Sequence, residues 1–327
     1  MSVNLSRRAL PKLALAISAS LTAACSSART QVEATSGVSG GLISIIVGDE
    51  KNAFWQAQSE LSGAEAKRLG YTVQVSSSGN DLDVESALVD QAIAEDPVAL
   101  IIGVASADGS VPALERVRHA NIPAFLLNTG VTQDDLATAV LTSDNTQGAI
   151  LGATEFARRM RGSGTYVELL GLQADANAKI RSDGYASVLS KVPMLQRVGE
   201  AVADWDVDKG HDAMVALLKD HPDIKGVLAG NDGMARGAAK ALDKAGRRDV
   251  IIGAFDGSPE AVDDVRSGVL AYTILQPVEQ FARKVVLEVH EFLLTGTTGA
   301  ATVTQSFDCE LITAGNAADY VSPFVLR

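Results

Sequence analysis

From residue 42 onward, the chain alternates short apolar runs with longer segments in which apolar residues recur at helical spacing. The apolar runs are rich in valine and isoleucine, and they follow one another at intervals of roughly thirty residues. Buried strands that alternate with helices are typical of parallel sheets built from right-handed crossovers. The expected strands cover residues 42–47, 71–75, 99–102, 124–127, 138–141, 166–170, 197–202, 226–229, 250–254 and 270–274, and the clearest helical segments cover residues 55–69, 84–94 and 146–160.

This number of strands is more than one open sheet carries comfortably. We therefore expect an α/β protein with two doubly wound, parallel-sheet lobes. In sheets of this kind, a ligand binds outside the carboxyl ends of the strands. Polar side chains stand just after several expected strands, at Asn52, Asn128, Asn231, Asp256 and Gln276. Together they predict one polar ligand site at the strand ends.

Most of these residues also have a local explanation. Asn231 or Asp232 can cap the helix that follows, because short polar side chains accept hydrogen bonds from the first turn of a helix. Asp256 can be a turn residue, Asn128 can belong to a turn, and Gln276 can simply end a strand. The sequence alone leaves both explanations open for each residue.

A stretch of two adjacent aromatic residues follows the first expected strand. Lys51–Trp55 reads KNAFW, with an amide side chain just before the rings of Phe54 and Trp55. Aromatic faces stack on the C–H surface of a sugar ring while polar groups take its hydroxyls. Core packing is the alternative role for both rings.

The first 25 residues have the form of an export signal. Arg7, Arg8 and Lys12 provide a positive start, and the apolar stretch 13–23 that follows is too short to span a membrane. The segment SRRALPK resembles a twin-arginine signal, so export by the general secretory route and by the twin-arginine route both remain open.

The end of this signal offers a candidate lipidation site. The letters LTAAC resemble a bacterial lipobox with Cys25 as the acylated residue, although Thr22 stands where a leucine is usual. Alternatively, Cys25 is discarded with the signal. Residues 26–41 are rich in Ser, Thr and Gly without an apolar period, which predicts a flexible tether.

Composition excludes several classes of function. The net charge of −12 argues against nucleic acid or an anionic membrane surface as partner, so membrane contact is expected only through a lipid anchor. With Cys25 removed or acylated, Cys309 is unpaired and is expected to be a buried structural thiol. The four histidines lack metal-ligand spacing, and no nucleophile elbow, phosphate loop or dinucleotide fingerprint is present. We expect no metal, no cofactor and no catalysis.

Several strings of the chain, in order and spacing, resemble one known family. They are KNAFW with AEAKRLGY, NIPAFLLN, TSDNTQGAILGA, AKIRSDGY, AGNDGMARGAAKAL, IIGAFDGSPEAV and YTILQP. The family is the ribose-binding-protein-like group of periplasmic substrate-binding proteins, the soluble receptors of ABC sugar importers with the type I periplasmic binding protein fold. The resemblance runs from about residue 42 to the C-terminus.

The resemblance implies two α/β lobes joined by a three-stranded hinge that closes on one ligand. The first lobe would comprise residues 42–143 plus 277–302, and the second would comprise residues 144–276 plus 303–327. The hinge crossings would lie near Ser143-Asp144, Gln276-Pro277 and the Val303 region. The protein would be a monomer that delivers a monosaccharide or polyol to a membrane permease.

The resemblance also assigns roles to residues. Phe54 and Trp55 of the first lobe and Trp205 of the second would sandwich the ligand ring. Arg181 would donate a fork of hydrogen bonds to ligand oxygens. The hydroxyl partners would be Asn52, Asn128, Asn231, Asp256 and Gln276.

For two of these residues a simpler role remains open. Trp205 can be a half-exposed loop residue, and Arg181 can pair with Asp183 or another acid on a helix face.

Two departures from the family's ribose binders bear on the ligand. Those proteins carry an Asp-Arg pair where this chain has Asn128-Thr129, and an Asn-Pro pair where it has Gly103-Val104. An anionic acceptor and a guanidinium fork are both missing, so ribose is not expected to bind as it does there. A differently arranged sugar, a deoxy sugar or a polyol is expected instead.

Three other functions are alternatives to solute import. A receptor for a furanosyl signal molecule or a chemotaxis ligand would use the same cleft, with a chemoreceptor as partner. A sugar-responsive repressor shares the fold but would begin with a DNA-binding domain, where this chain has an export signal. For an enzyme, Asp256 and Arg181 could form an acid–base pair, but no nucleophile accompanies them.

Overall fold

The computed structural model describes residues 40–321 and 323–327. The expected export signal with Cys25 and nearly all of the expected tether lie outside the described residues. Within them, no helix has the length and apolar character needed to cross a bilayer. The described part also holds no cluster of three or more His, Cys, Asp or Glu side chains suited to a metal ion.

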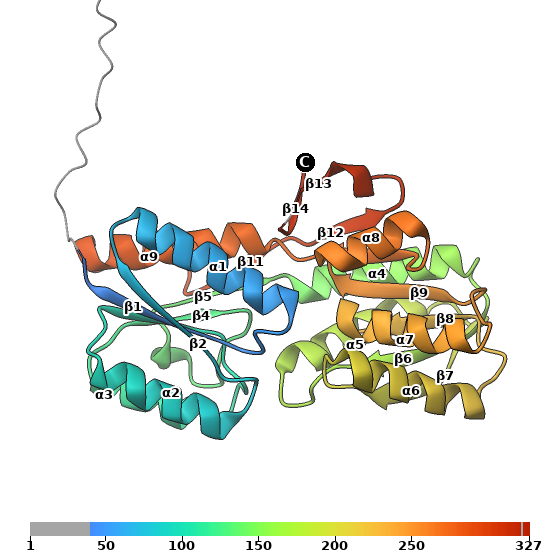
Figure 1. Ribbon diagram of the computed structural model, residues 1–327, viewed down its shortest axis with the longest axis horizontal. Coiled ribbons are helices and arrows are strands. Elements are labelled where there is room, and N and C mark those ends of the chain that lie inside the picture. Colours follow the sequence, from blue (N-terminus) through green and yellow to red (C-terminus); the bar gives the residue numbers. More distant parts are fainter. Residues whose placement is uncertain (1–39, 322) are drawn as a thin grey trace, which may run out of the picture. The chain divides into compact units, whose positions relative to one another are not determined.

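The first sheet is parallel throughout and has the strand order β11-β5-β4-β3-β1-β2 (Figure 1). Its strands are β1 (Leu42–Val47), β2 (Thr72–Ser77), β3 (Ala99–Ile102), β4 (Ala124–Leu127), β5 (Ala139–Ser143) and β11 (Thr304–Phe307). Its helices are α1 (Ala53–Arg68), α2 (Leu82–Ala94), α3 (Val111–His119) and α9 (Val278–Thr295), with a 3-10 turn η1 (Asp134–Leu136) before β5. Helices α1 and α9 cover one face and α2 and α3 cover the other, so apolar residues of β1 are buried on both sides.

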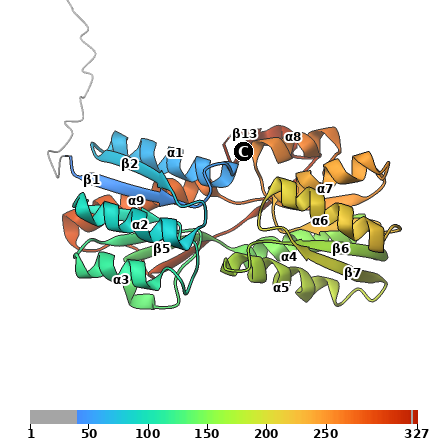
Figure 2. The same ribbon diagram turned by 60° about the horizontal axis from the view of Figure 1, so that its bottom comes forward.

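The second sheet repeats this plan with the order β12-β10-β9-β8-β6-β7, in which only β12 runs antiparallel to its neighbour. Its strands are β6 (Gly164–Leu170), β7 (Leu195–Val202), β8 (Gly226–Ala229), β9 (Ile251–Asp256), β10 (Tyr272–Leu275) and β12 (Glu310–Thr313). Its helices are α4 (Asn145–Arg159), α5 (Ala176–Leu189), α6 (Val207–Asp220), α7 (Asp232–Lys244) and α8 (Pro259–Ser267). Figure 2 shows α4 and α5 on one side of this sheet and α6 and α7 on the other.

The expectation of two parallel-sheet α/β lobes is confirmed. Every strand expected from the sequence lies in one of the two sheets, with ends that differ by at most a few residues. The four strands after residue 300 were not expected, because segments such as Thr304–Phe307 are short, polar and half-exposed.

The chain passes between the sheets three times. The first passage follows β5 and the second follows β10, at Gln276. The third lies between β11 and β12, slightly later than the expected Val303 region. The reason is that Thr304–Phe307 pairs with β5 and therefore still belongs to the first sheet.

Two further features complete the fold. After β12, a 3-10 turn η2 (Ala317–Asp319) leads into a short antiparallel hairpin of β13 (Tyr320–Val321) and β14 (Val325–Leu326). Cys309, between β11 and β12, is a buried free thiol as expected, and burial raises its pKa to about 12.

Candidate functional site

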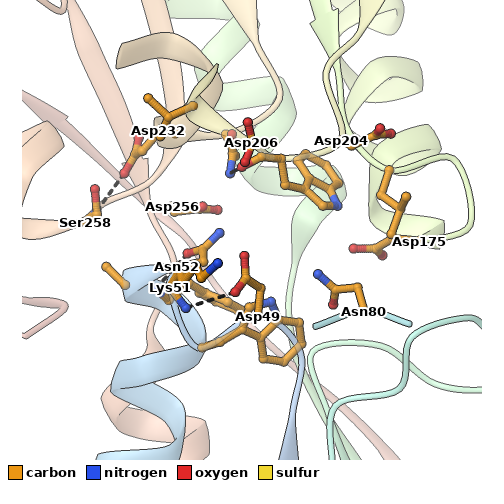
Figure 3. A pocket seen from close by; sticks show the side chains of 18 of the residues that line it. Asp49, Lys51, Asn52, Asn80, Asp175, Asp204, Asp206, Asp232, Asp256 and Ser258 are labelled. Carbon is orange, nitrogen blue, oxygen red and sulfur yellow. Dashed lines mark hydrogen bonds between the residues drawn. The ribbon is translucent and has the colours of Figure 1, made fainter. Parts of the chain in front are cut away.

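A cavity of about 430 Å³ lies between the two sheets, at the carboxyl ends of their strands (Figure 3). This volume is in the range of small-molecule sites. The structure brings together all of the residues expected to bind a ligand, which line this one cavity: Asn52, Phe54, Trp55, Asn128, Arg181, Trp205, Asn231, Asp256 and Gln276.

Trp55 of the first lobe rests on two glycines. A Cβ atom at Gly48, just after β1, or at Gly103, just after β3, would overlap the indole ring. Trp55 is 6% exposed, so its ring forms part of the cavity wall and only a small part of it meets solvent. Both glycines are needed because the ring approaches the backbone too closely for any side chain.

Trp205 of the second lobe is seated in the same way. A Cβ atom at Gly171, just after β6, would overlap its ring, and one at Gly230, after β8, would come within 3.0 Å of it. Trp205 and the preceding Asp204 have φ angles of 64° and 48°, a left-handed conformation that costs non-glycine residues about 1–2 kcal/mol each. The backbone is therefore strained at these two residues, and this strained conformation holds the Trp205 ring in the cavity wall.

Phe54 is both a cavity residue and a core residue, the two alternatives for its role. It lines the cavity, yet only 5% of it is exposed, and its ring makes an edge-to-face contact with Trp55 at 5.2 Å. Phe281 of α9 lies 6.3 Å away and Phe324 of the C-terminal hairpin 6.4 Å away. Phe54 is therefore a core residue with one edge at the cavity.

The two amides that precede helices are also helix caps. The Oδ1 atom of Asn52 accepts a hydrogen bond from the Phe54 amide, and that of Asn231 accepts one from the Met234 amide. The Nδ2 atom of Asn231 also donates to the carbonyl of Trp205 at 3.1 Å. The local explanation offered for Asn231 is therefore correct, and the cap formed by Asn52 is a further finding of the structure. Each residue keeps the remaining capacity of its amide for a ligand.

Arg181 is held in place by a network of buried partners. Its Nε donates to Asn145, and its Nη1 donates to the carbonyl of Gly230 at 2.7 Å and to Asp256 at 3.1 Å. The alternative pairing with Asp183 does not occur, since that carboxylate binds Lys179.

The guanidinium of Arg181 also lies over aromatic rings, 3.9 Å from the centroid of Phe255 and 5.2 Å from that of Trp205. Such cation–π contacts orient the group without using its N–H donors. The Nη2 atom has no hydrogen bond within the described residues and remains available to a ligand oxygen.

Asp256 and Gln276 are coupled to each other. The Gln276 Nε2 atom donates to Oδ1 of Asp256 at 2.7 Å, while its own Oε1 is buried without a partner among the described residues. Burial raises the pKa of Asp256, and the Arg181 guanidinium opposes that rise. The φ angle of Asp256 is 125°, rare for a residue other than glycine, so its carboxylate is held at some cost in strain.

Asn128 also has a second role, as a contact between the lobes. It has a φ angle of 73°, which asparagine tolerates. The Nδ2 atom of Asn177, at the start of α5, donates to the side-chain and backbone oxygens of Asn128 at 3.3 and 3.4 Å. Its neighbour Thr129 is buried and is not among the residues that line the cavity.

Sequence reasoning missed several polar wall residues, most clearly Asp175 and Asn80. Figure 3 shows their side chains pointing toward the same part of the cavity. Burial raises the pKa of Asp175. The indole Nε1 of Trp205 lies beside this carboxylate but makes no hydrogen bond of good geometry, so it too can serve a ligand oxygen.

A signal for Asp175 was available in the sequence. Asp175 stands five residues after the last residue of β6, Leu170. Asn52 likewise stands five residues after the last residue of β1, Val47. Both residues cap the next helix. Comparing the two lobes position by position would therefore have found Asp175.

The cavity wall is acidic overall. It carries seven carboxylates and four basic side chains. The carboxylates are Asp49, Asp175, Asp204, Asp206, Asp232, Asp256 and Glu260, and the cations are Lys51, Arg181, Lys209 and Arg236. An anionic ligand would be repelled, so the site suits a neutral, hydroxyl-rich molecule.

Comparisons with known proteins agree with this geometry. Residues 43–296 match the model of a family described as periplasmic binding protein domain. The chain is 38% identical over 286 residues to the D-apiose import binding protein of Paraburkholderia graminis, covering 88% of this chain and 91% of that protein. It is 30% identical over 287 residues to the ribose import binding protein of Salmonella typhimurium, covering 88% and 94%.

A solved structure supports the fold. The ABC transporter solute binding protein from Agrobacterium vitis, bound to α-D-tagatopyranose, matches with a TM-score of 0.81 at 21% identity. The match covers 88% of this chain and 99% of that one.

The seating of Trp205 can be tested with Gly171→Ala. The φ angle of Gly171 does not require glycine, so the added methyl acts only by displacing the ring. We expect a loss of about 1–3 kcal/mol in the free energy of unfolding, typical of overpacking, and a red-shifted Trp205 emission in a Trp55→Phe background. Chemical denaturation and fluorescence measure these effects.

The matched control is Gly63→Ala in α1, where the added Cβ meets nothing closer than Val73 at 3.8 Å. It should leave the emission unchanged. Wild-type emission and stability in Gly171→Ala would show that the ring is not seated on this glycine.

The buried acid Asp232 predicts a pH dependence of stability. Its oxygens accept hydrogen bonds from Thr273 and the Ser258 amide, but burial, reinforced by nearby Asp256, raises its pKa to about 8. Between an ordinary carboxyl pKa of about 4 and this value, the folded state keeps a proton that the unfolded state releases. Stability should therefore fall as pH rises from about 4 to about 8.

Thermal unfolding should show a melting temperature at least about 3 °C higher at pH 5 than at pH 8. Asp232→Asn should remove at least half of this difference, whereas Asp220→Asn, an exposed aspartate outside the cavity wall, should leave it unchanged. Equal pH slopes in the wild type and Asp232→Asn would contradict the assignment.

Proposed function

Because the chain belongs to the periplasmic binding protein family, we propose that it is the extracytoplasmic solute-binding component of an ABC importer. In this function it captures a neutral monosaccharide or polyol between its lobes and presents it to the membrane permease. The relatives are import binding proteins rather than enzymes, in agreement with the expectation of a non-catalytic protein.

The observation that carries the proposal is the pairing of aromatic walls with unsatisfied polar atoms in one cavity. Trp55 and Trp205 provide flat apolar surfaces for the C–H faces of a sugar. The free Nη2 of Arg181 and the unpartnered Oε1 of Gln276 offer a donor and an acceptor. A hydroxyl group is both donor and acceptor, so a sugar can satisfy both.

Closure of the hinge would follow from the same contacts. Groups of both lobes line the cavity, so a ligand that touches both stabilises the closed arrangement more than the open one. The closed form is the one that the permease would recognise.

Among sugars, we favour a compact branched pentose of the D-apiose type. The relative with 38% identity is named as a D-apiose binder, and the ribose import binding protein is 30% identical. The surroundings of Gly103 argue against binding of ribose in the way that the family's ribose binders bind it. Trp55 occupies the space above it, so the asparagine that ribose binders carry there would not fit.

Export and anchoring belong to the same proposal. The protein acts outside the cytoplasm as a monomer. The signal in residues 1–25 directs its export. Lipidation of Cys25 and the twin-arginine route rest on sequence motifs alone. A furanosyl signal as ligand would use the same cleft. A chemoreceptor as a second partner would recognise the closed form, as the permease does.

A ligand panel tests the proposal. The mature protein is melted with D-apiose, D-ribose, myo-inositol, a furanosyl signal molecule, D-galacturonate and ribose 5-phosphate, each at excess. Ligand at a hundredfold excess over its dissociation constant stabilises the folded state by about 2.7 kcal/mol. We expect D-apiose to give the largest shift, about 5–10 °C for a protein of this size.

The two anions serve as the control, because the acidic wall should exclude both of them. A larger shift with an anionic sugar than with any neutral one would contradict the proposed ligand class. No shift with any member of the panel, using protein unfolded and refolded to remove bound ligand, would contradict the proposed function.

A further inference from the structure

The segment after β12 connects the second lobe to the first. Its 3-10 turn η2 lies against α8, where the carbonyl of Ala317 accepts hydrogen bonds from Arg266, at 2.6 Å from Nη2 and 3.2 Å from Nε. Ala317 itself is 1% exposed. The start of this segment is therefore fixed to the second lobe.

The end of the same segment contacts the first lobe through one aromatic ring. Phe324 is 2% exposed, and its ring meets the ring of Phe54 edge to face, at 6.4 Å and 78°. Its backbone has a φ of 56°, and its amide donates to the Tyr320 hydroxyl at 2.9 Å. Because its ring is buried and its backbone is strained, Phe324 must be held in this position by the residues around it.

Phe54 is the point where this contact reaches the ligand site. It lines the cavity on one edge and packs against Trp55, a second wall residue, at 5.2 Å. Figures 1 and 2 both place the hairpin between α1 and α8, and the ring of Phe324 contacts that of Phe54. The cavity wall is therefore supported from outside by the C-terminal hairpin.

We propose that the hairpin of β13 and β14 is a brace between the lobes, and that Phe324 is a positioning residue for Phe54. The brace holds the Phe54 ring at the cavity and stabilises the arrangement in which the two lobes face each other. The part of the proposal that concerns ligand affinity rests on the proposed function.

The physical argument concerns two attachments of one short segment. Ala317 is fixed to α8 and Phe324 to α1, so a rotation of one lobe against the other must strain or break one of these contacts. A contact that exists in only one arrangement shifts the equilibrium toward that arrangement by its own free energy. Removing the ring should therefore favour the open arrangement and weaken ligand binding.

The first test compares three variants with D-apiose as the probe. Phe324→Ala should raise the dissociation constant at least fivefold, mainly through faster dissociation in stopped-flow tryptophan fluorescence. Phe324→Leu, which keeps apolar volume, should recover most of the affinity. The control Phe156→Leu alters a buried ring of the second lobe that packs on Tyr166 outside the cavity wall, and it should lower stability but leave affinity within twofold.

Arg266→Gln keeps the test decisive if Phe324→Ala fails to fold. It loosens the other end of the brace without removing any ring from the core, because the Arg266 side chain is 42% exposed. Affinity should fall in the same direction as in Phe324→Ala. Wild-type affinity in Arg266→Gln, together with wild-type affinity in Phe324→Ala where that variant folds, would overturn the proposal.

The second test needs no ligand. Small-angle scattering of the ligand-free protein should show a larger radius of gyration for Phe324→Ala and Arg266→Gln than for the wild type and Phe156→Leu. An unchanged scattering profile in both brace variants overturns the brace. If the wild type binds none of the sugars, the proposed function fails, and the scattering still decides on the brace separately.

Discussion

The site depends on one constraint, which is that each lobe packs a tryptophan ring against two glycines at the ends of neighbouring strands. Gly48 and Gly103 follow β1 and β3, while Gly171 and Gly230 follow β6 and β8, and these strand pairs occupy equivalent places in the two sheets. Without a Cβ atom at these points, the rings form flat walls at the sheet edge. The polar groups then surround a space whose two apolar sides are the rings of Trp55 and Trp205. The backbone of the four glycines sets the positions of these rings.

The second determinant of the site is electrostatic. Arg181 is buried and is oriented by hydrogen bonds to Asn145, Gly230 and Asp256 as well as by two aromatic rings. Breaking a buried pair by removing one partner leaves an uncompensated charge, so Arg181 and Asp256 stabilise each other only together. The remaining acidic side chains of the wall would repel an anionic ligand.

The sequence was sufficient for the fold because strand and helix periods are local signals that tertiary packing did not override. The rule of ligands at strand ends located five polar residues of the cavity wall, because it applies to each strand separately, and the family resemblance added the aromatic residues and Arg181. The sequence could not show that Asn52 and Asn231 would cap helices and line the cavity at once, since that depends on rotamers. Thr304–Phe307 was missed because a half-exposed edge strand has no apolar pattern. The contact of Phe324 with Phe54 was missed because it joins residues that lie far apart in the sequence.

The double use of the asparagine caps has a consequence for how such a protein can change its cargo in evolution. The side chains of Asn52, Asn231 and Arg181 make hydrogen bonds to their own helices or to buried partners. Replacing any of them would therefore lower the stability of the fold as well as change the ligand selectivity. Asn80 is partly exposed, and its side chain makes no hydrogen bond within the described residues. New specificities within this scaffold should therefore arise first at that side of the cavity, while the strongly tied residues stay the same across proteins that transport different sugars.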